Sequence, residues 1–255
     1  MLRYTYYEIL RTVLNKSALF SFILMPVAFY LLFGAMQSSS SFPMHDGTVG
    51  TYVMIGMAIY GAVLSATALS GNMVTELQSG WARTLGLTPL RFSHYLASKI
   101  ITALCAATLS VTAVFGVGVC TGTKIPPPQL LGCAAVIIFS SLLFVLYGMV
   151  AALIIPGENA VSIAIGLVVM FAMFGTLFVP LPETLMPWAR YTPLYGMAQL
   201  ARRPFTNGDI IYQNDEGFRY MTESLGAALA NYGAWLLIFT VLLALLWRRR
   251  ATVRR

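Results

Sequence analysis

One short segment of this 255-residue chain concentrates side chains that could make polar contacts. Residues 73–99 read MVTELQSGWARTLGLTPLRFSHYLASK and lie between two long apolar runs. Charged residues make up only 10% of the whole chain, so their clustering here is informative. We expect this segment to contact a water-soluble partner, because binding residues are often carried on connections between rigid elements. Its ionisable side chains are Glu76, Arg83, Arg91, His94 and Lys99.

The patterns that would make the chain an enzyme are missing from the sequence. None of the lysines, Lys16, Lys99 and Lys124, follows a glycine, so the G-x-x-x-x-G-K-[ST] loop that cradles nucleotide phosphates is absent. The GxSxG and HExxH patterns of hydrolases are absent as well. The three cysteines have no CxxC spacing. We therefore expect no catalytic residue, no metal site, no cofactor and no ATPase site in this chain.

The composition predicts that the chain lies in a membrane. Hydrophobic residues make up 58% of it, and the mean hydropathy is +0.76, well above that of an ordinary soluble domain. Six apolar stretches of about 18 residues or more are each long enough to cross a bilayer core of roughly 30 Å as a helix. We predict an all-α polytopic membrane protein with one domain, residues 1–255. The predicted spans are 17–36, 51–72, 100–122, 130–155, 161–179 and 226–247.

The basic residues predict how the chain is oriented. With the N-terminus inside, eleven of the 16 lysines and arginines fall in cytoplasmic segments. Both termini are therefore predicted to be cytoplasmic. The net charge of +7 fits this topology and attraction to anionic lipid. It does not indicate a nucleic-acid partner.

Three segments have patterns that suggest their surroundings. Residues 1–16 are amphipathic, which favours a helix on the cytoplasmic membrane surface, although a simple extension of the first span is equally compatible. The loop 180–225 starts with prolines and aromatic residues and becomes polar, which predicts an outer-leaflet hairpin before the last span. The second span has a small residue at every fourth position. This stripe favours close packing, either within the chain or against a second copy. Its residues are Ala58, Ala62, Ala66 and Ser70.

The first half of segment 73–99 predicts a short helix. Leu77, Trp81 and Leu85 recur every four residues and would form one apolar stripe. Gly80 and Gly86 lower helix stability, so the helix should be short and followed by a turn.

The second half of this segment carries a helix start signal. Thr88 suits an N-cap, and Pro89 suits the first helical position. A helix that starts here would run through Lys99 into the third span. The whole segment then forms a helix–turn–helix elbow. A solvated loop that merely covers the bilayer surface is the alternative.

The elbow resembles a known element. Residues 76–85, ELQSGWARTL, followed by TPL at 88–90, are similar to the cytoplasmic loop of ABC-2 type permeases. The pieces Met186-Pro187-Trp188 and Thr192-Pro193-Leu194 resemble the hairpin before the last span in that family. The resemblance covers essentially the whole chain and is to the drug- and antibiotic-export type. It implies a permease subunit of a bacterial ABC exporter, located in the plasma (inner) membrane. In such an exporter two permease subunits form the pathway and separate ATPase subunits bind ATP.

The resemblance also implies a role for the elbow as a coupling helix seated in a cleft of the ATPase. Closure of the ATPase pair would push the elbow and switch the helices between inward- and outward-facing states. Glu76 would make a charged contact, Trp81 and Leu85 would fill apolar pockets, and Arg83 would lie at the rim. The coupling residues are Glu76, Leu77, Gly80, Trp81, Arg83, Leu85, Thr88 and Pro89.

The cargo is less well defined. Because no ionisable residue falls clearly inside a predicted span, we expect amphipathic or hydrophobic cargo, such as a drug, antibiotic, peptide or lipid. Tyr60, Phe171 and Phe174 could line its pathway, although ordinary packing is the alternative role for each. Two other classes of function stay open: an ATP-independent carrier or channel, and a membrane scaffold or immunity protein. A homodimer and a heterodimer are both compatible with the sequence.

Overall fold

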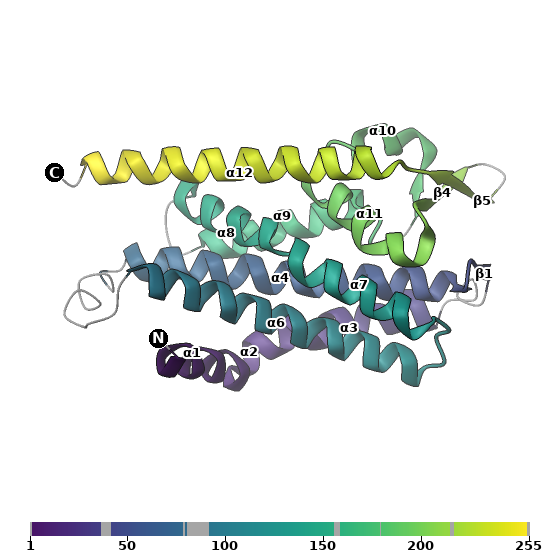
Figure 1. Cartoon of the computed structure of the whole chain (residues 1–255), viewed down its shortest axis with the longest axis horizontal. Helices are drawn as coiled ribbons and strands as arrows, with labels where there is room; N and C mark the ends of the chain where they lie inside the picture. Colours follow the sequence, from purple (N-terminus) through teal and green to yellow (C-terminus); the bar gives the residue numbers. More distant parts are fainter. Residues whose placement is uncertain are drawn as a thin grey trace.

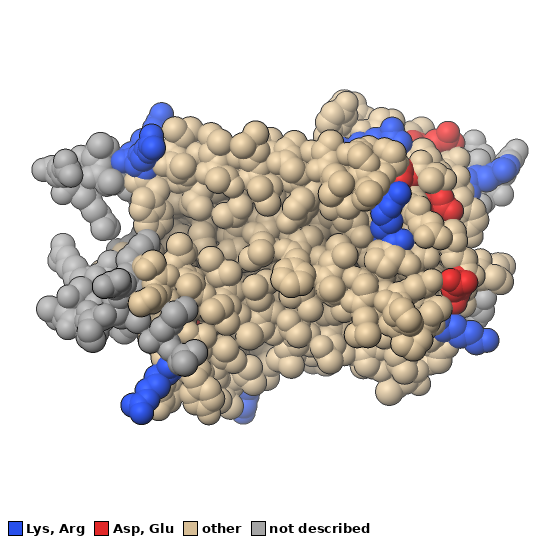
Figure 2. Space-filling model, in the orientation of Figure 1, with Lys and Arg blue, Asp and Glu red and all other residues tan. Residues whose placement is uncertain are grey.

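The computed structural model describes residues 2–36, 42–78, 80, 92–155, 159–178, 180–214 and 217–253. Long helices run side by side along one axis of the molecule (Figure 1). The chain starts and ends at the same end of the molecule, here called the terminal end, and the strands lie at the opposite end, here called the strand end (Figure 1). Charged side chains on the visible face lie near these two ends, and uncharged residues cover its middle (Figure 2).

The elements follow one another in a simple order. The first part of the chain contains α1 (Leu2–Leu14), α2 (Lys16–Leu19), η1 (Phe20–Leu24), α3 (Met25–Tyr30), η2 (Leu31–Ala35), β1 (Pro43–Met44), β2 (Gly47–Thr48), α4 (Val49–Gln78), α6 (Phe92–Cys120), α7 (Pro127–Ser140) and α8 (Leu142–Ile154). The second part contains α9 (Ala160–Phe174), β3 (Leu181–Pro182), η4 (Glu183–Leu185), α10 (Met186–Ala189), α11 (Pro193–Thr206), β4 (Asp209–Asn214), β5 (Gly217–Thr222) and α12 (Leu225–Val253).

The predicted helical membrane fold is confirmed in its main features. Within the described residues, five helical stretches are long and apolar enough to cross a membrane, and they match five of the predicted spans. They are Lys16–Ala35, Val49–Leu77, Ser93–Cys120, Pro127–Ile154 and Leu225–Arg249. The remaining predicted span, 161–179, corresponds to α9, which has only 15 residues and is about 22 Å long. The count of six spans therefore stays a prediction.

The first span contains two π-helical turns, and Pro26 follows the first of them. Pro26 has no backbone N–H, so it cannot donate to the carbonyl of Phe22 one turn earlier. The hydroxyl of Ser110 on α6 donates to that carbonyl instead, at 2.6 Å. Gly61 on α4 makes room for this contact, because a Cβ there would lie 2.0 Å from the Ser110 oxygen. In lipid, where no water can satisfy a freed carbonyl, such a side-chain donor stabilises the span.

Helix α4 is the central element of the molecule. Its membrane stretch is 94% buried inside this single chain. The small-residue stripe lies within this buried surface, so it serves packing within the chain and does not provide a free face for a second copy. Gly148 on α8 shows how closely the helices approach, because a Cβ there would lie 2.2 Å from the Ser70 oxygen. The buried stripe residues are Ala58, Ala62, Ala66 and Ser70.

The predicted loop 180–225 is folded, and part of it is β structure that we did not expect. Strands β4 and β5 pair in antiparallel fashion, and β3 adds to β4 in parallel. Between β3 and β4, α10 and α11 form a helical hairpin, and α11 is followed by Asn207 with φ +53 and Gly208 with φ +105. These left-handed residues end the helix and turn the chain into β4.

Candidate functional site at the base of the elbow

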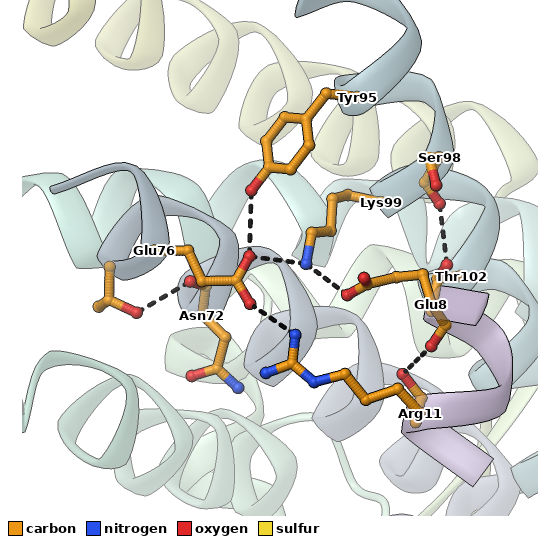
Figure 3. Close-up of polar contacts among 10 residues, drawn as sticks. Glu8, Arg11, Asn72, Glu76, Tyr95, Ser98, Lys99 and Thr102 are labelled. Carbon is orange, nitrogen blue, oxygen red and sulfur yellow. Dashed lines mark hydrogen bonds and ion pairs between the residues drawn. The ribbon is translucent and has the colours of Figure 1, made fainter. Parts of the chain in front are cut away.

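Three helices bring charged side chains together at the terminal end. Glu8 and Arg11 lie three residues apart on α1, and Tyr95 and Lys99 lie four residues apart on α6. Both spacings place two side chains on one face of a helix. Glu76 comes from the last turns of α4 and lies between these two pairs (Figure 3). We call these five residues the base cluster, because they join the two helices between which the elbow runs.

The contacts of the base cluster converge on Glu76 and Lys99. The Lys99 ammonium lies 2.7 Å from Glu76 Oε2, and it also donates to Glu8 Oε1. The Tyr95 hydroxyl donates to Glu76 Oε2 at 3.1 Å. Arg11 Nη1 lies 3.4 Å from the other carboxylate oxygen, Glu76 Oε1. Both oxygens of Glu76 are thus held by residues of this chain (Figure 3).

Burial decides which of these contacts carry most of the energy. The Lys99 side chain is only 6% exposed, against 12% for Glu8 and 24% for Glu76. Arg11 is 71% exposed, and an ion pair with such an exposed partner contributes roughly 0–1 kcal/mol. The inner part of the base cluster is therefore one ammonium between two carboxylates, which is sensitive to the loss of any one charge.

The backbone of α1 explains why this helix can reach the cluster. Asn15 is in an extended conformation, and its side-chain oxygen accepts from the backbone N–H groups of Ser17 and Ala18. It ends α1 at Leu14 and caps α2, so α1 is a separate helix and not an extension of the first span. Because α1 is separate, it can lie against α6 and direct Glu8 towards Lys99.

The structure describes only part of the predicted coupling segment. Leu77 is half-buried against the apolar core, and Gly80 adopts a turn with φ +94, a conformation that only glycine tolerates well. The helix that was expected to run through Lys99 into the third span is present from Phe92 onwards. The remaining predicted coupling residues lie outside the described residues; they are Trp81, Arg83, Leu85, Thr88 and Pro89.

Of the three aromatic residues considered for a cargo pathway, Tyr60 and Phe171 belong to the main apolar core and Phe174 does not. Tyr60 is buried, and its ring packs 5.1 Å from that of Phe178. Phe171 packs at 5.8 Å against Tyr147. Phe174 packs against a separate apolar cluster beneath the hairpin. Among the described residues, no ring contact joins any two of these three aromatic residues.

Two features of the charged residues were missed by sequence reasoning. Glu8 and Arg11 were assigned to a surface helix, and their pairing with Glu76 and Lys99 was not expected. The spacing of Glu8 and Arg11 was a usable signal, but their partners lie far away in the sequence. Arg202 was assigned to an external loop, whereas the structure buries it completely. The apolar and small residues around it, Ala198, Ala201 and Phe205, were the signal for this burial.

These features define the class of protein to which the chain belongs. It is a multi-pass helical membrane protein whose base cluster links three helices at one end. Comparison with known families is specific: the sequence model of the family described as "ABC-2 family transporter protein" matches residues 43–248. The chain therefore belongs to the ABC-2 transporter family and is the membrane subunit of a transporter.

A similar protein sequence supports this assignment. The chain is 26% identical over 212 residues to the protein named "Putative transport permease YvfS" of Bacillus subtilis (strain 168). The match covers 81% of this chain and 86% of that protein. Membership of the family implies that the chain works in a membrane together with ABC ATPase partners.

Proposed function

We propose that this chain is the permease subunit of an ATP-driven ABC exporter and that the elbow 73–99 is its coupling helix. ATP binds to separate ATPase subunits, and their closure pushes the elbow. The chain then alternates between inward- and outward-facing states and moves an amphipathic or hydrophobic cargo, such as a drug, antibiotic, peptide or lipid, out of the cell. Family membership supports the permease role, and the base cluster supports the coupling role.

The base cluster is the observation that carries this proposal. A force applied to the elbow must reach the spans without bending the joints at which the elbow starts and ends. Glu76 lies near the end of α4, and Tyr95 and Lys99 lie in the first turns of α6. Their contacts tie these two helices together directly at the base of the elbow, and Glu8 adds α1 to the same joint. Such a buried, bonded joint transmits displacement as a rigid unit.

This geometry gives the predicted coupling residues two kinds of role. Glu76 and Leu77 hold the elbow to the body of the protein through contacts within this chain. Gly80 supplies the turn. In our proposal, Trp81 and Leu85 enter apolar pockets of the ATPase, Arg83 lies at the rim of the contact, and Thr88-Pro89 restarts the helix towards α6.

The proposal assigns a side of the membrane to each end of the molecule. We place the terminal end, with both termini and the elbow, in the cytoplasm, since the ATPase and its ATP are there. The acidic residues seen in Figure 2 lie at the strand end. The assignment of sides follows from the excess of basic residues in the segments that we place in the cytoplasm. Two permease copies, or this chain and a related one, form the pathway.

A cross-linking experiment with two tryptophan positions tests the proposal. A photo-cross-linking amino acid replaces Trp81 in the elbow or, as the matched control, Trp188, which is 69% exposed at the strand end. We expect the Trp81 position to capture, in native membranes, a protein whose peptides contain a G-x-x-x-x-G-K-[ST] sequence, and the Trp188 position to capture none. Capture at Trp188 alone, or at neither position, contradicts the proposed coupling contact.

A further inference from the structure

Arg202 on α11 is a charged residue in a fully enclosed place. None of its surface is exposed. Its Nη1 donates to the Thr176 hydroxyl at 2.9 Å, and its Nη2 donates to the Thr176 carbonyl at 2.8 Å. Its guanidinium carbon lies 3.7 Å from the centre of the Tyr52 ring, so the charge stacks on that ring. Arg202 thereby joins α11 to the start of α4 and to the chain just after α9.

The residues around the guanidinium are adapted to it. Thr176 adopts φ +57, which is unusual for a β-branched residue. Its hydroxyl also lies 3.3 Å from the Tyr52 hydroxyl, so the three residues close a triangle. Gly56, one turn after Tyr52, leaves the necessary space, since a Cβ there would lie 2.7 Å from Arg202 Nη2. We call Tyr52, Thr176 and Arg202 the arginine clamp.

The closed clamp is also costly. An arginine stays protonated in proteins, and taking its charge out of water carries a large desolvation penalty. Among the residues that the structure describes, no carboxylate forms an ion pair with Arg202. Two buried donors, Arg202 Nε and Gln199 Nε2, have no acceptor there. Opening the contact would hydrate the Arg202 guanidinium and its unpaired Nε, so the clamp is suited to release as well as to hold.

The helical hairpin has a different kind of attachment to α12. Asn231 of α12 donates to the Arg190 carbonyl at 2.6 Å and accepts from the Gly196 N–H at 3.1 Å. Trp235 donates to the Tyr191 carbonyl at 3.0 Å. These are neutral bonds to the hairpin backbone, without a buried charge. The hairpin is therefore attached to α12 through neutral bonds and to α4 through the charged arginine clamp.

We propose that Arg202 is the positioning residue that holds the hairpin α10–α11 closed on α4 and releases it when the strand end opens. This inference rests on the proposed function for its driving force. Helix α4 is unbroken over 30 residues, from Val49 near the clamp to Gln78 beside the base cluster. It is about 45 Å long. Displacement of the elbow can therefore reach Tyr52 through one rigid helix and draw its ring away from the guanidinium.

A native cysteine provides the test. Cys133 on α7 is fully buried, close to Arg202 and Phe205 of α11. The exposed Cys105 and Cys120 are replaced by alanine, and the full chain with its ATPase is placed in membrane vesicles. A membrane-impermeant maleimide is then applied on the side of the strand end. We expect slow labelling of Cys133 at rest and labelling at least about tenfold faster during ATP hydrolysis, equivalent to about 1.4 kcal/mol.

The variants separate the clamp from general stability. In Arg202→Met, Cys133 should be labelled about tenfold faster than in the parent protein, even without nucleotide. The reason is that a desolvated cation–π contact and two charged hydrogen bonds are lost. Tyr52→Leu, which keeps both bonds to Thr176, should label at an intermediate rate and serves if Arg202→Met does not fold. Arg203→Met is the matched control, because Arg203 donates to the Glu223 carbonyl at 3.2 Å, away from the clamp residues, and Cys133 in this variant should be labelled slowly.

The outcomes are distinct. Folded Arg202→Met and Tyr52→Leu proteins whose Cys133 labels at the parent rate would overturn the clamp. A second outcome is rapid labelling of Cys133 in Arg202→Met, with a rate in the parent protein that does not change when ATP is added. It would support the clamp and contradict the ATP-driven function. An unchanged thermal unfolding temperature in the rapidly labelled variant would exclude a general loss of structure as its cause.

Discussion

The most informative single change is Lys99→Met, because Lys99 is the cation between two carboxylates. The oxygens of Glu8 and Glu76 bind the same ammonium, which lies 2.7 Å from Glu76. Two carboxylate oxygens on one ammonium lie within about 6 Å of each other, and without the lysine they repel by about 3 kcal/mol at an effective dielectric constant of about 20. Glu76 is 24% exposed, so water reduces this cost, and we expect a loss of about 2–3 kcal/mol of stability.

This loss should be measurable as thermal unfolding of the detergent-solubilised protein. For a chain of this size, about 2–3 kcal/mol corresponds to a decrease in Tm of roughly 5–10 °C. Adding Glu8→Gln to Lys99→Met removes one of the two facing carboxylates and should recover about half of the decrease. Lys124→Met is the control, because Lys124 is exposed at the strand end, and it should leave Tm unchanged. A Lys99→Met protein with the parent Tm, or no recovery on adding Glu8→Gln, refutes this account of the base cluster.

Three further substitutions test other parts of the structure. Gly80→Val forces a β-branched residue to φ +94, at a cost of about 1–3 kcal/mol. This variant should still insert into the membrane but should no longer stimulate the ATPase. The control is Gly116→Val, where a Cβ meets open space; it should insert and stimulate the ATPase like the parent. Ser110→Ala leaves unpaired the carbonyl that Pro26 frees and should cost about 1–3 kcal/mol in thermal unfolding; a smaller cost in a Pro26→Ala background is the expected check. Gly56→Ala should displace the clamp and speed up labelling of the α7 thiol, and an unchanged rate would count against the clamp geometry.

The membrane fold was predictable from sequence because the bilayer imposes simple local requirements. Long apolar runs identified the five spans that the structure describes. The helix that runs through Lys99 into the third span followed from the helix start signal before it. The strands β4 and β5 were not predicted, because each has only six residues. Their alternation is weak beside the strong apolar signal of the spans.

The base cluster and the arginine clamp depend on partners that are distant in the sequence. Glu8 and Lys99 are 91 positions apart, and Arg202 and Thr176 are 26 positions apart. Charge and hydropathy patterns describe a residue's neighbours along the chain, so they placed Glu8 on a surface and Arg202 in a loop. Only the packing of α1 on α6, and of α11 on α4, shows what these charges contact.

The central claim is that energy enters this chain through the elbow from a separate ATPase. The most direct measurement is ATP hydrolysis by the purified ATPase partner in lipid vesicles, with and without this chain. We expect the intact chain to change the hydrolysis rate several-fold, Lys124→Met to act like the intact chain, and Lys99→Met to lose most of the effect while still binding the ATPase. Hydrolysis that is the same with and without the intact chain would contradict the claim.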